Sequence, residues 1–316
     1  MKRRDFLQIL TVAPMAVLGA KYMGGTETLP KDLPKTLLQP ELKVNANSSK
    51  LVSVLANLNL GDHVIIAGRP SMGKTSVALN FMTNLACVEN KACAYFSIEQ
   101  SKEALMTRML AICAEVPKAS IARGKLSDEQ FDKITIEAGV ISDSNIFIDD
   151  TAGITVAEIS RRLSRLKKSG VDAKYVFIDY LQLLKSDLKH DCRRDEVESI
   201  IAQLKQLALD QNVIMVTLAQ LNRGVEARSD RRPLLTDLRE FRFEQSAPNI
   251  DKVVLLYRDD YYDKSLQTKN IELIVARDKK EKCLTYVAKF DNSTLKISKF
   301  ELMQSNDSSV HYRQRS

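Results

Sequence analysis

The segment 68–75, GRPSMGKT, constrains the fold more than any other part of the chain, because it fits the pattern G-x-x-x-x-G-K-[ST]. The apolar run HVIIA precedes it and the helix-compatible run SVALNFM follows it. A strand, a glycine-containing turn and a helix in this order bring backbone N–H groups and the positive end of a helix to one point. The sequence therefore predicts a phosphate-binding loop in an α/β fold, rather than a turn without a ligand.

The residues of this loop have separate expected roles. Gly68 and Gly73 let the backbone approach phosphate oxygens, and Ser71 lies between them in the same cradle. Lys74 is expected to reach the β- and γ-phosphates, and Thr75 to offer its hydroxyl to a magnesium ion. We therefore expect ATP and Mg²⁺ as ligands.

Two hydrophobic strands end in an aspartate that suits the magnesium ion. Asp179 closes YVFID and Asp149 closes NIFID, and the ligands of open parallel sheets collect at such strand ends. The order of the sequence alone leaves both aspartates open. Glu99, after the strand AYFSI, is a candidate for orienting the attacking water, with a solvated loop glutamate as the alternative.

Short strand-like runs alternate with amphipathic helices along the middle of the chain. The strand-like runs are 63–67, 92–97, 145–149, 175–179 and 213–218, and the clearest helix covers 194–210. Such alternation predicts a mostly parallel central sheet flanked by helices on both faces. Four later runs are separated by short turns and predict antiparallel edge strands: 252–257, 271–276, 284–291 and 295–300.

Composition predicts where the folded domain begins and ends along the chain. The first twenty residues, MKRRDFLQILTVAPMAVLGA, resemble a twin-arginine export signal, and a disordered arm is the alternative for the segment 1–23. Prolines and the run NANSS predict a linker over 24–49. We expect one folded domain over 50–303 and a polar tail over 304–316.

Charge and cysteine spacing narrow the class of protein. The net charge of +7 is a moderate basic excess that fits nucleic acid without requiring it. The five cysteines include no C-x-x-C pair, so neither a disulfide framework nor a zinc ribbon is expected. The apolar run 9–20 is shorter than the roughly 20 residues of a membrane span, and no membrane substrate is expected.

Six motifs, taken together, resemble the C-terminal motor domain of DnaB-like replicative DNA helicases, the RecA-like P-loop ATPases of superfamily 4. They occur in the order typical of that family between residues 61 and 276: GRPSMGKT, FSIEQS, IDYLQLL, QLKQLA, LAQLNRGVEARSDRRPLLTDLRE and LLYRDDYY. The resemblance implies that Glu99 activates the water and that Asp179, rather than Asp149, holds the magnesium ion. It also implies that Gln220 senses the γ-phosphate and couples it to DNA.

The same resemblance implies a DNA-binding loop after the strand that ends at Gln220. Guanidinium groups on such a loop bind single-stranded DNA through its phosphates, without sequence preference. A solvated loop of mixed charge is the alternative, because several acids are interleaved. The chain departs from the family here, reading DLREFRFEQSAPNID where members read DLRESG followed by an acidic pair. The candidate DNA-binding residues are Arg231, Arg232, Arg239, Glu240 and Arg242.

A second departure concerns the group that reaches the γ-phosphate of a neighbouring subunit. Members of the family present KQRNG, whereas this chain reads RDKKE over 277–281. Arg277 and Lys279 are the candidates for this finger, in exchanged order. Only a guanidinium bridges two phosphate oxygens with two parallel N–H bonds.

The leading functional hypothesis is an ATP-dependent DNA helicase that forms a homo-hexamer and moves along single-stranded DNA, with a replication loader or a primase as a further partner. Two alternatives stay open: a RecA-like DNA-binding ATPase without unwinding activity, and a nucleotide-gated binding module. ATP and replicating DNA predict a cytoplasmic protein, whereas the N-terminal segment predicts an exported or membrane-tethered one. We favour the cytoplasmic location.

Overall fold

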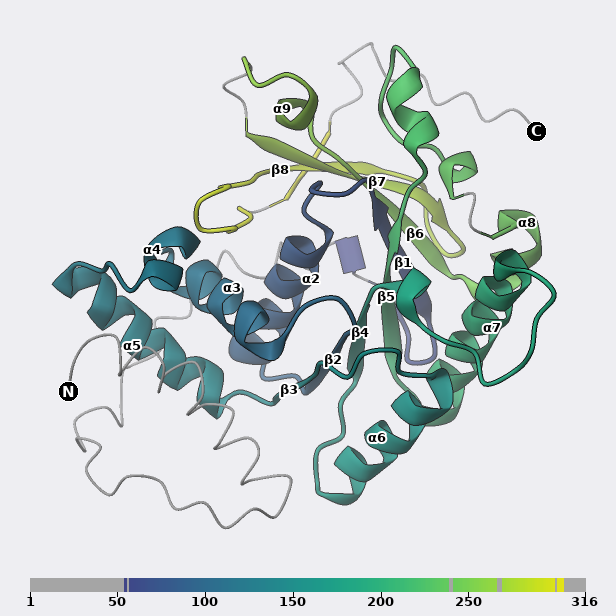
Figure 1. The fold of residues 1–316 in the computed structure, drawn as a ribbon, viewed down its shortest axis with the longest axis horizontal. Helices are drawn as coiled ribbons and strands as arrows, with labels where there is room; N and C mark the ends of the chain where they lie inside the picture. Colours follow the sequence, from purple (N-terminus) through teal and green to yellow (C-terminus); the bar gives the residue numbers. More distant parts are fainter. Residues whose placement is uncertain (1–53, 56, 239–240, 266–268, 299, 304–316) are drawn as a thin grey trace.

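The computed structural model describes residues 54–303 apart from 56, 239–240, 266–268 and 299. The segments predicted as leader, linker and tail lie outside the described residues. The described chain forms a nine-stranded sheet in the order β3-β2-β4-β5-β1-β6-β7-β8-β9 (Figure 1). The strands are β1 His63–Gly68, β2 Cys93–Ser97, β3 Ile146–Asp149, β4 Tyr175–Asp179, β5 Ile214–Gln220, β6 Lys252–Tyr257, β7 Asn270–Asp278, β8 Thr285–Lys289 and β9 Glu301–Leu302.

Strands β1 to β6 form the parallel part of the sheet. Every residue of β1 and β6 is buried, which explains why these strands read as nearly continuous apolar runs. The predicted mostly parallel sheet is confirmed. Because the strands are parallel, the carboxyl ends of β1, β2, β4, β5 and β6 meet at one edge.

The antiparallel part begins at β7, one strand later than the sequence indicated, because β6 pairs parallel with β1 and antiparallel with β7. Strands β8 and β9 continue the antiparallel edge. The predicted strand over 295–300 is wrong: its described residues give one isolated bridge, Phe290 to Ile297. Leu295 has a φ of +63° and its amide bonds Asp291 O at 2.7 Å, so the chain turns there.

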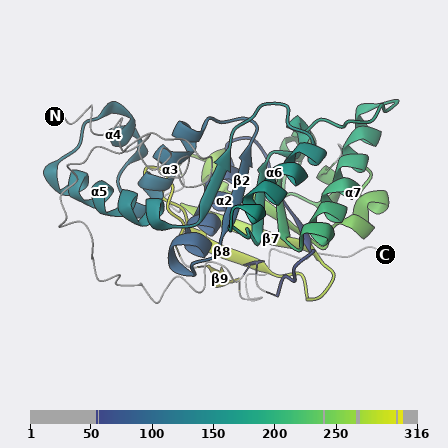
Figure 2. The same cartoon turned by 90° about the horizontal axis from the view of Figure 1, so that it is seen from below.

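Helices cover both faces of the sheet (Figure 1). On one face lie α2 Lys74–Thr83, the π-helical turn Asn84–Val88, α3 Lys102–Ala114, α4 Lys118–Arg123 and α5 Asp128–Asp143. On the other lie α6 Val156–Lys168, α7 Arg193–Gln211 and α8 Phe243–Ser246, and Figure 2 shows α5 and α7 at opposite ends of the molecule. Each face has its own hydrophobic cluster. The helix predicted over 194–210 is confirmed.

Short 3-10 helices occupy the connections at Leu181–Leu183, Arg223–Ala227, Leu235–Asp237 and Ala247–Asn249, and α9 spans Asp259–Tyr262. Polar caps start several longer helices. Ser127 and Gln130 form a capping box at α5, and Thr155 accepts the amide of Glu158 at α6.

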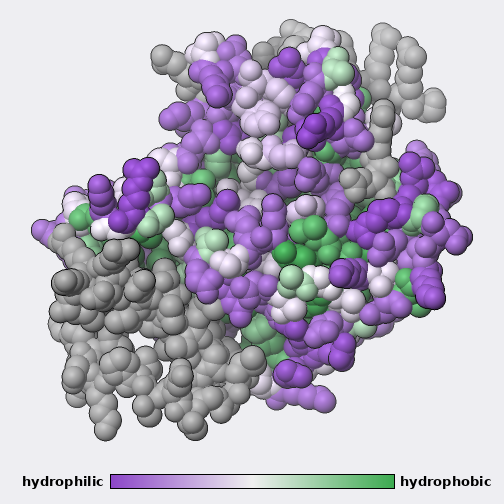
Figure 3. All heavy atoms as spheres, in the orientation of Figure 1, coloured by the Kyte–Doolittle hydropathy of each residue, from purple (hydrophilic) through white to green (hydrophobic). Residues whose placement is uncertain are grey.

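The surface is mainly hydrophilic on the face drawn in Figure 3, with a hydrophobic area between the positions of β5 and α7 in Figure 1. Among the described residues, no helix combines the length and the apolar character that crossing a bilayer requires.

Candidate nucleotide site and the loop after β5

A cavity of about 400 Å³ lies at the edge where the parallel strands end. The loop between β1 and α2 forms one wall, and the ends of β2, β4, β5 and β6 form another. The lining residues are Pro70, Ser71, Gly73, Lys74, Thr75, Ser76, Glu99, Gln100, Arg108, Asp179, Tyr180, Gln220, Arg258, Phe290, Asn292 and Leu295. The structure thus brings together most of the predicted nucleotide-site residues, with Gly68 at the end of β1 leading into the loop.

The loop before α2 has the backbone that a phosphate cradle needs. Gly73 caps α2 with a φ of +96°, a conformation in which a side chain is strained. Lys74 folds back over the loop, and its Nζ donates to Gly68 O at 3.0 Å and to Arg69 O at 3.2 Å. Burial lowers the pKa of Lys74 to about 8, although the charges of Asp179 and Glu99 act in the opposite direction. The amine is therefore held next to the cavity by two backbone carbonyls of the loop.

Thr75 and Asp179 form an oxygen pair at the floor of the cavity. Thr75 Oγ1 donates to Asp179 Oδ2 at 2.7 Å, and Gln100 Nε2 lies 3.4 Å from Thr75 Oγ1. The hydroxyl of Tyr95 on β2 also donates to Asp179 Oδ2, at 2.8 Å. Burial raises the pKa of Tyr95 well above its usual value, so this donor stays protonated. A hydroxyl and a carboxylate side by side are the hard oxygen ligands that suit Mg²⁺.

Asp149, the other strand-end aspartate, lies away from this pair. Its carboxylate accepts hydrogen bonds from Arg162 and from the amide of Thr151. The two aspartates end strands that flank β2 on opposite sides, so only β4 delivers its aspartate next to Thr75. The sequence order could not separate them because it does not give the order of strands in the sheet.

Glu99 and Gln220 reach the same cavity from different strands. Glu99 follows β2 and is exposed, while Gln220 is the last residue of β5. The backbone of Gln220 is clamped by the side chain of Gln182, whose Oε1 accepts its amide and whose Nε2 donates to its carbonyl, both at 3.1 Å. These contacts leave the Gln220 side chain at the cavity wall and fix the point where the next loop begins.

Several residues of the cavity were missed in the sequence. Arg258, at the end of β6, donates to Asp260 and to Asn292 Oδ1 and lies 4.5 Å above the Phe290 ring. Arg108 comes from α3. The motif LLYRDDYY marks Arg258, but Asn292 and Phe290 follow β8, where the sequence carries no pattern that points to this edge.

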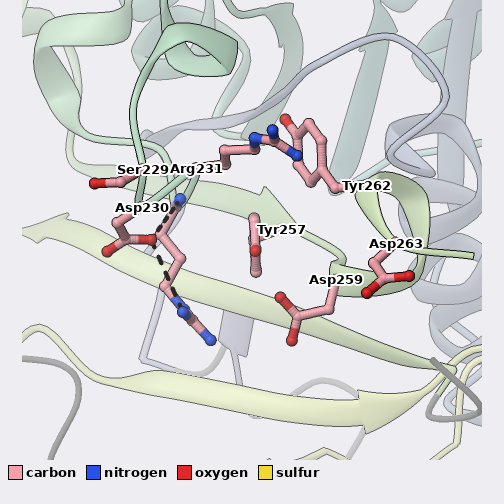
Figure 4. A pocket seen from close by; sticks show the side chains of 8 residues that line it. Ser229, Asp230, Arg231, Tyr257, Asp259, Tyr262 and Asp263 are labelled. Carbon is pink, nitrogen blue, oxygen red and sulfur yellow. Dashed lines mark hydrogen bonds and ion pairs between the residues drawn. The ribbon is translucent and has the colours of Figure 1, made fainter. Parts of the chain in front are cut away.

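A second cavity of about 400 Å³ lies between the loop after β5 and α9 (Figure 4). Arg231 is exposed, and its guanidinium lies 4.8 Å above the Tyr262 ring. Arg232 instead makes two bonds to Glu272, at 2.9 and 2.7 Å, and Arg242 pairs with Glu198 and Asp195. Two of the predicted DNA-binding arginines are therefore ion-paired within the chain. Arg239 and Glu240 lie outside the described residues.

The finger candidates lie at the amino ends of the parallel strands, whereas the nucleotide cavity lies at their carboxyl ends. Arg277 is in register with Val253 at the start of β6, whereas the cavity lies beyond the end of β6. Its Nη2 donates to Ala247 O at 3.1 Å and its guanidinium lies 5.2 Å above the Phe243 ring. Lys279 Nζ donates to Pro248 O at 2.7 Å and to Asp251 Oδ1 at 3.0 Å. Neither residue lies at the cavity of its own chain.

Comparison with known proteins agrees with this geometry. The family model for the DnaB-like helicase C terminal domain matches residues 44–299. Replicative DNA helicase DnaC of Bacillus subtilis (strain 168) is 42% identical over 235 residues, which cover 73% of this chain and 51% of that protein. Replicative DNA helicase DnaB of Geobacillus stearothermophilus is 40% identical over the same shares. The chain thus spans about half the length of the curated relatives it matches.

Solved structures show the same fold. The ATPase domain of G40P superposes with a TM-score of 0.75 at 32% identity, over 82% of this chain and 91% of that one. A DnaB-like replicative helicase, described with its interactions with primase, gives the same TM-score and identity over 82% of this chain and 63% of its own. With its RecA-like sheet and the motif residues gathered at one edge, the chain belongs to the DnaB-like helicase C-terminal domain family.

Proposed function

We propose that this chain is the ATP-hydrolysing motor of a replicative DNA helicase that moves along single-stranded DNA. The observation that supports this most is that the two sites are continuous in sequence. Gln220 lines the nucleotide cavity, and the next residue begins the arginine-rich loop 221–232, which carries Arg223, Arg228, Arg231 and Arg232. A change at the γ-phosphate reaches that loop through one side chain. The relatives that match this chain are named replicative DNA helicases.

In this proposal five residues of the cavity have separate tasks. Lys74 binds the β- and γ-phosphates, Glu99 orients the attacking water, and Gln220 contacts the γ-phosphate. Thr75 and Asp179, whose side-chain oxygens lie 2.7 Å apart, would hold the magnesium ion. When bound, Mg²⁺ neutralises charge on the phosphate oxygens.

Single-stranded DNA is the proposed nucleic-acid partner. Arg231 offers an exposed guanidinium, while Arg232 and Arg242 would exchange their carboxylate partners for phosphates. Such binding is independent of sequence and weakens as salt rises. A homo-hexamer is the proposed assembly, because Arg277 and Lys279 lie away from the nucleotide cavity of their own chain and would reach a nucleotide only in a neighbouring copy. A loader or a primase is a proposed further partner.

The test is ATP hydrolysis by the purified full chain with and without a single-stranded oligonucleotide, beside Lys74→Ala. We expect turnover that rises with the oligonucleotide and is lost in Lys74→Ala. In a second assay we expect the wild type to unwind a forked DNA duplex. Turnover that does not respond to DNA would reject the motor function, and ATP binding without any turnover would favour the nucleotide-gated binding module.

A DNA-binding ATPase without unwinding activity is the second candidate. The chain reads RDKKE at the finger, and Lys279 is held by Asp251 and Pro248. An ammonium in place of a bidentate guanidinium favours weaker action on a neighbour's phosphate. DNA-stimulated hydrolysis without unwinding of a forked duplex would support this candidate.

We propose a cytoplasmic location, because ATP and replicating DNA are available there. The test is cell fractionation of the wild type and of a variant with Arg3→Lys and Arg4→Lys. We expect both proteins in the cytoplasmic fraction. Periplasmic protein that disappears in the variant would show that the N-terminal segment works as an export signal.

A further inference from the structure

Arg69, the second residue of the phosphate-binding loop, joins that loop to the loop after β5. Only 7% of Arg69 is exposed. Its Nη1 donates to Leu221 O at 2.8 Å, while Nε and Nη2 both donate to Glu226 Oε1, at 2.9 and 2.8 Å. Its own carbonyl accepts from Lys74 Nζ. One residue therefore contacts both the phosphate-binding lysine and the start of the arginine-rich loop.

The ion pair with Glu226 links a buried group to a half-exposed one. The side chain of Arg69 is 8% exposed and that of Glu226 is 40% exposed. Removal of the carboxylate would leave a buried guanidinium with Leu221 O as its remaining described partner, and an uncompensated buried charge is costly. The guanidinium would then have to move, and the phosphate-binding loop would move with it.

Other contacts hold the loop on both sides of Glu226, before and after it in the sequence. The amide of Leu221 donates to Gly68 O at 3.2 Å, and Gln182 clamps Gln220, so the first residues after β5 are fixed. Further along, Arg232 is fixed to β7 by Glu272. Between these anchors, Glu226 in the 3-10 helix Arg223–Ala227 is the described link back to the phosphate-binding loop.

The exposed end of this connection is Arg231 (Figure 4). Its guanidinium lies above the Tyr262 ring, and the charges of Glu226 and Arg69 both act on the Tyr262 hydroxyl, whose pKa is raised mainly by burial. Tyr262 therefore lies between Arg231 and the Arg69–Glu226 pair in charge terms, and a phosphate that draws Arg231 off this ring would change the charges that act on Tyr262.

We propose that the Arg69–Glu226 ion pair is a positioning contact that couples the occupancy of the nucleotide cavity to the conformation of loop 221–232. Linkage makes the effect reciprocal: nucleotide orders the loop, and nucleic acid on the loop changes how the nucleotide is held. This inference rests on the proposed function for the nature of the second ligand, but not for the coupling itself.

Amide hydrogen exchange of the full chain, with and without Mg²⁺ and a non-hydrolysable ATP analogue, tests the coupling without DNA or turnover. In the wild type we expect nucleotide to slow exchange in 221–232 by roughly fivefold or more. In Glu226→Gln we expect less than about twofold slowing, at a nucleotide concentration that saturates both proteins. Equal slowing in the two proteins, or none in the wild type, would overturn the proposal.

Glu272→Gln is the matched control. Like Glu226→Gln, this change removes a carboxylate that receives two hydrogen bonds from an arginine. Here the arginine is Arg232 of the loop, and the bonds connect the loop to β7 rather than to the phosphate-binding loop. We expect faster exchange in this variant with and without nucleotide, and a retained difference between the two states. If this variant also loses that difference, general loosening explains the result and the proposed coupling is rejected. Thermal unfolding of each variant verifies that it is folded.

ATP turnover adds a second readout. In Glu226→Gln we expect the DNA-stimulated kcat to fall by about tenfold, with the KM for ATP and the affinity for a single-stranded oligonucleotide little changed. Arg69→Lys keeps the charge but loses the paired N–H donors, and the double variant should be no worse than either single one. A parallel rise in KM and loss of folding would indicate a structural role instead. A wild type without DNA stimulation would reject the proposed function, while the exchange result still decides the coupling.

Discussion

Lys74 shows how one buried side chain makes nucleotide binding depend on pH. Burial lowers its pKa to about 8, and only the charged amine binds phosphate well. Above pH 8 the free protein loses this proton, so binding must take one up. We predict that nucleotide affinity is constant below pH 8 and falls by up to about tenfold per pH unit between pH 8 and 10, measured by titration calorimetry.

Lys74→Arg is the control for this prediction, because a guanidinium stays charged throughout that range. Its affinity for nucleotide should be lower at neutral pH but should change little up to pH 10. A wild-type affinity that stays flat to pH 10 would contradict the prediction.

At the scale of residues, the sequence predicted the parts that a local motif carries. Lys74, Thr75, Glu99, Asp179 and Gln220 all reach one cavity. The residues that complete it depend on contacts between distant segments: Tyr95 meets Asp179 across 84 positions, and Gln182 meets Gln220 across 38. Hydroxyl and amide side chains occur throughout strands and loops, so their types alone do not single them out.

At the scale of elements, the side chain of His63 connects β1 to β5 and to the turn before β6. It is fully buried, with Nε2 2.9 Å from Thr217 Oγ1 on β5 and Nδ1 3.1 Å from Asn249 O. Burial lowers its pKa to about 4, so the folded chain holds the neutral ring where the unfolded chain takes up a proton. Stability from this residue is complete above pH 6.5 and is lost as pH falls from 6.5 to 4, by about 3 kcal/mol.

Urea unfolding of the wild type and of His63→Gln at several pH values tests this prediction. The variant should be less stable at pH 7 but should lose less stability between pH 6.5 and 4, because it has no ring to protonate. Carboxylates, including the neighbouring Asp251, contribute to both proteins, so the difference between the two slopes isolates the histidine. Equal slopes would contradict the prediction.

The strands illustrate which elements a sequence reveals. Runs such as HVIIA and YVFID are short and rich in β-branched or aromatic residues, a pattern that favours buried strands, and β1 and β4 follow them closely. The run over 295–300 is also apolar in part, but its path depends on the turn that begins at Asp291, whose carboxylate accepts from Ser293 and Thr294. A turn stabilised in this way overrides strand propensity.

At the scale of the whole molecule, the nucleotide cavity and the finger candidates lie at opposite edges of one sheet. In the proposed ring, a complete site therefore needs residues from two copies. We predict that Lys74→Ala and the double variant Arg277→Ala with Lys279→Ala are each inactive, and that mixing them restores turnover. Random assembly of equal amounts makes roughly a quarter of the interfaces intact.

The mixture is measured by ATP hydrolysis over a range of total protein concentrations, with each variant alone at the same total concentration as the control. Restored turnover should rise with concentration, because it depends on association. A mixture that is no more active than its components would exclude Arg277 and Lys279 as groups that act on a neighbour.

Strand β7 connects the part of the sheet next to the nucleotide cavity with the part that carries the finger candidates. Its nine residues, Asn270–Asp278, run back from the cavity edge to the far edge and span about 30 Å. Deleting two of these residues would leave every remaining side chain on its own face of the sheet but would shorten the strand by about 7 Å. The length of β7 therefore sets the distance between the nucleotide cavity and the finger candidates of each copy in the proposed ring, independently of the residues that perform the chemistry.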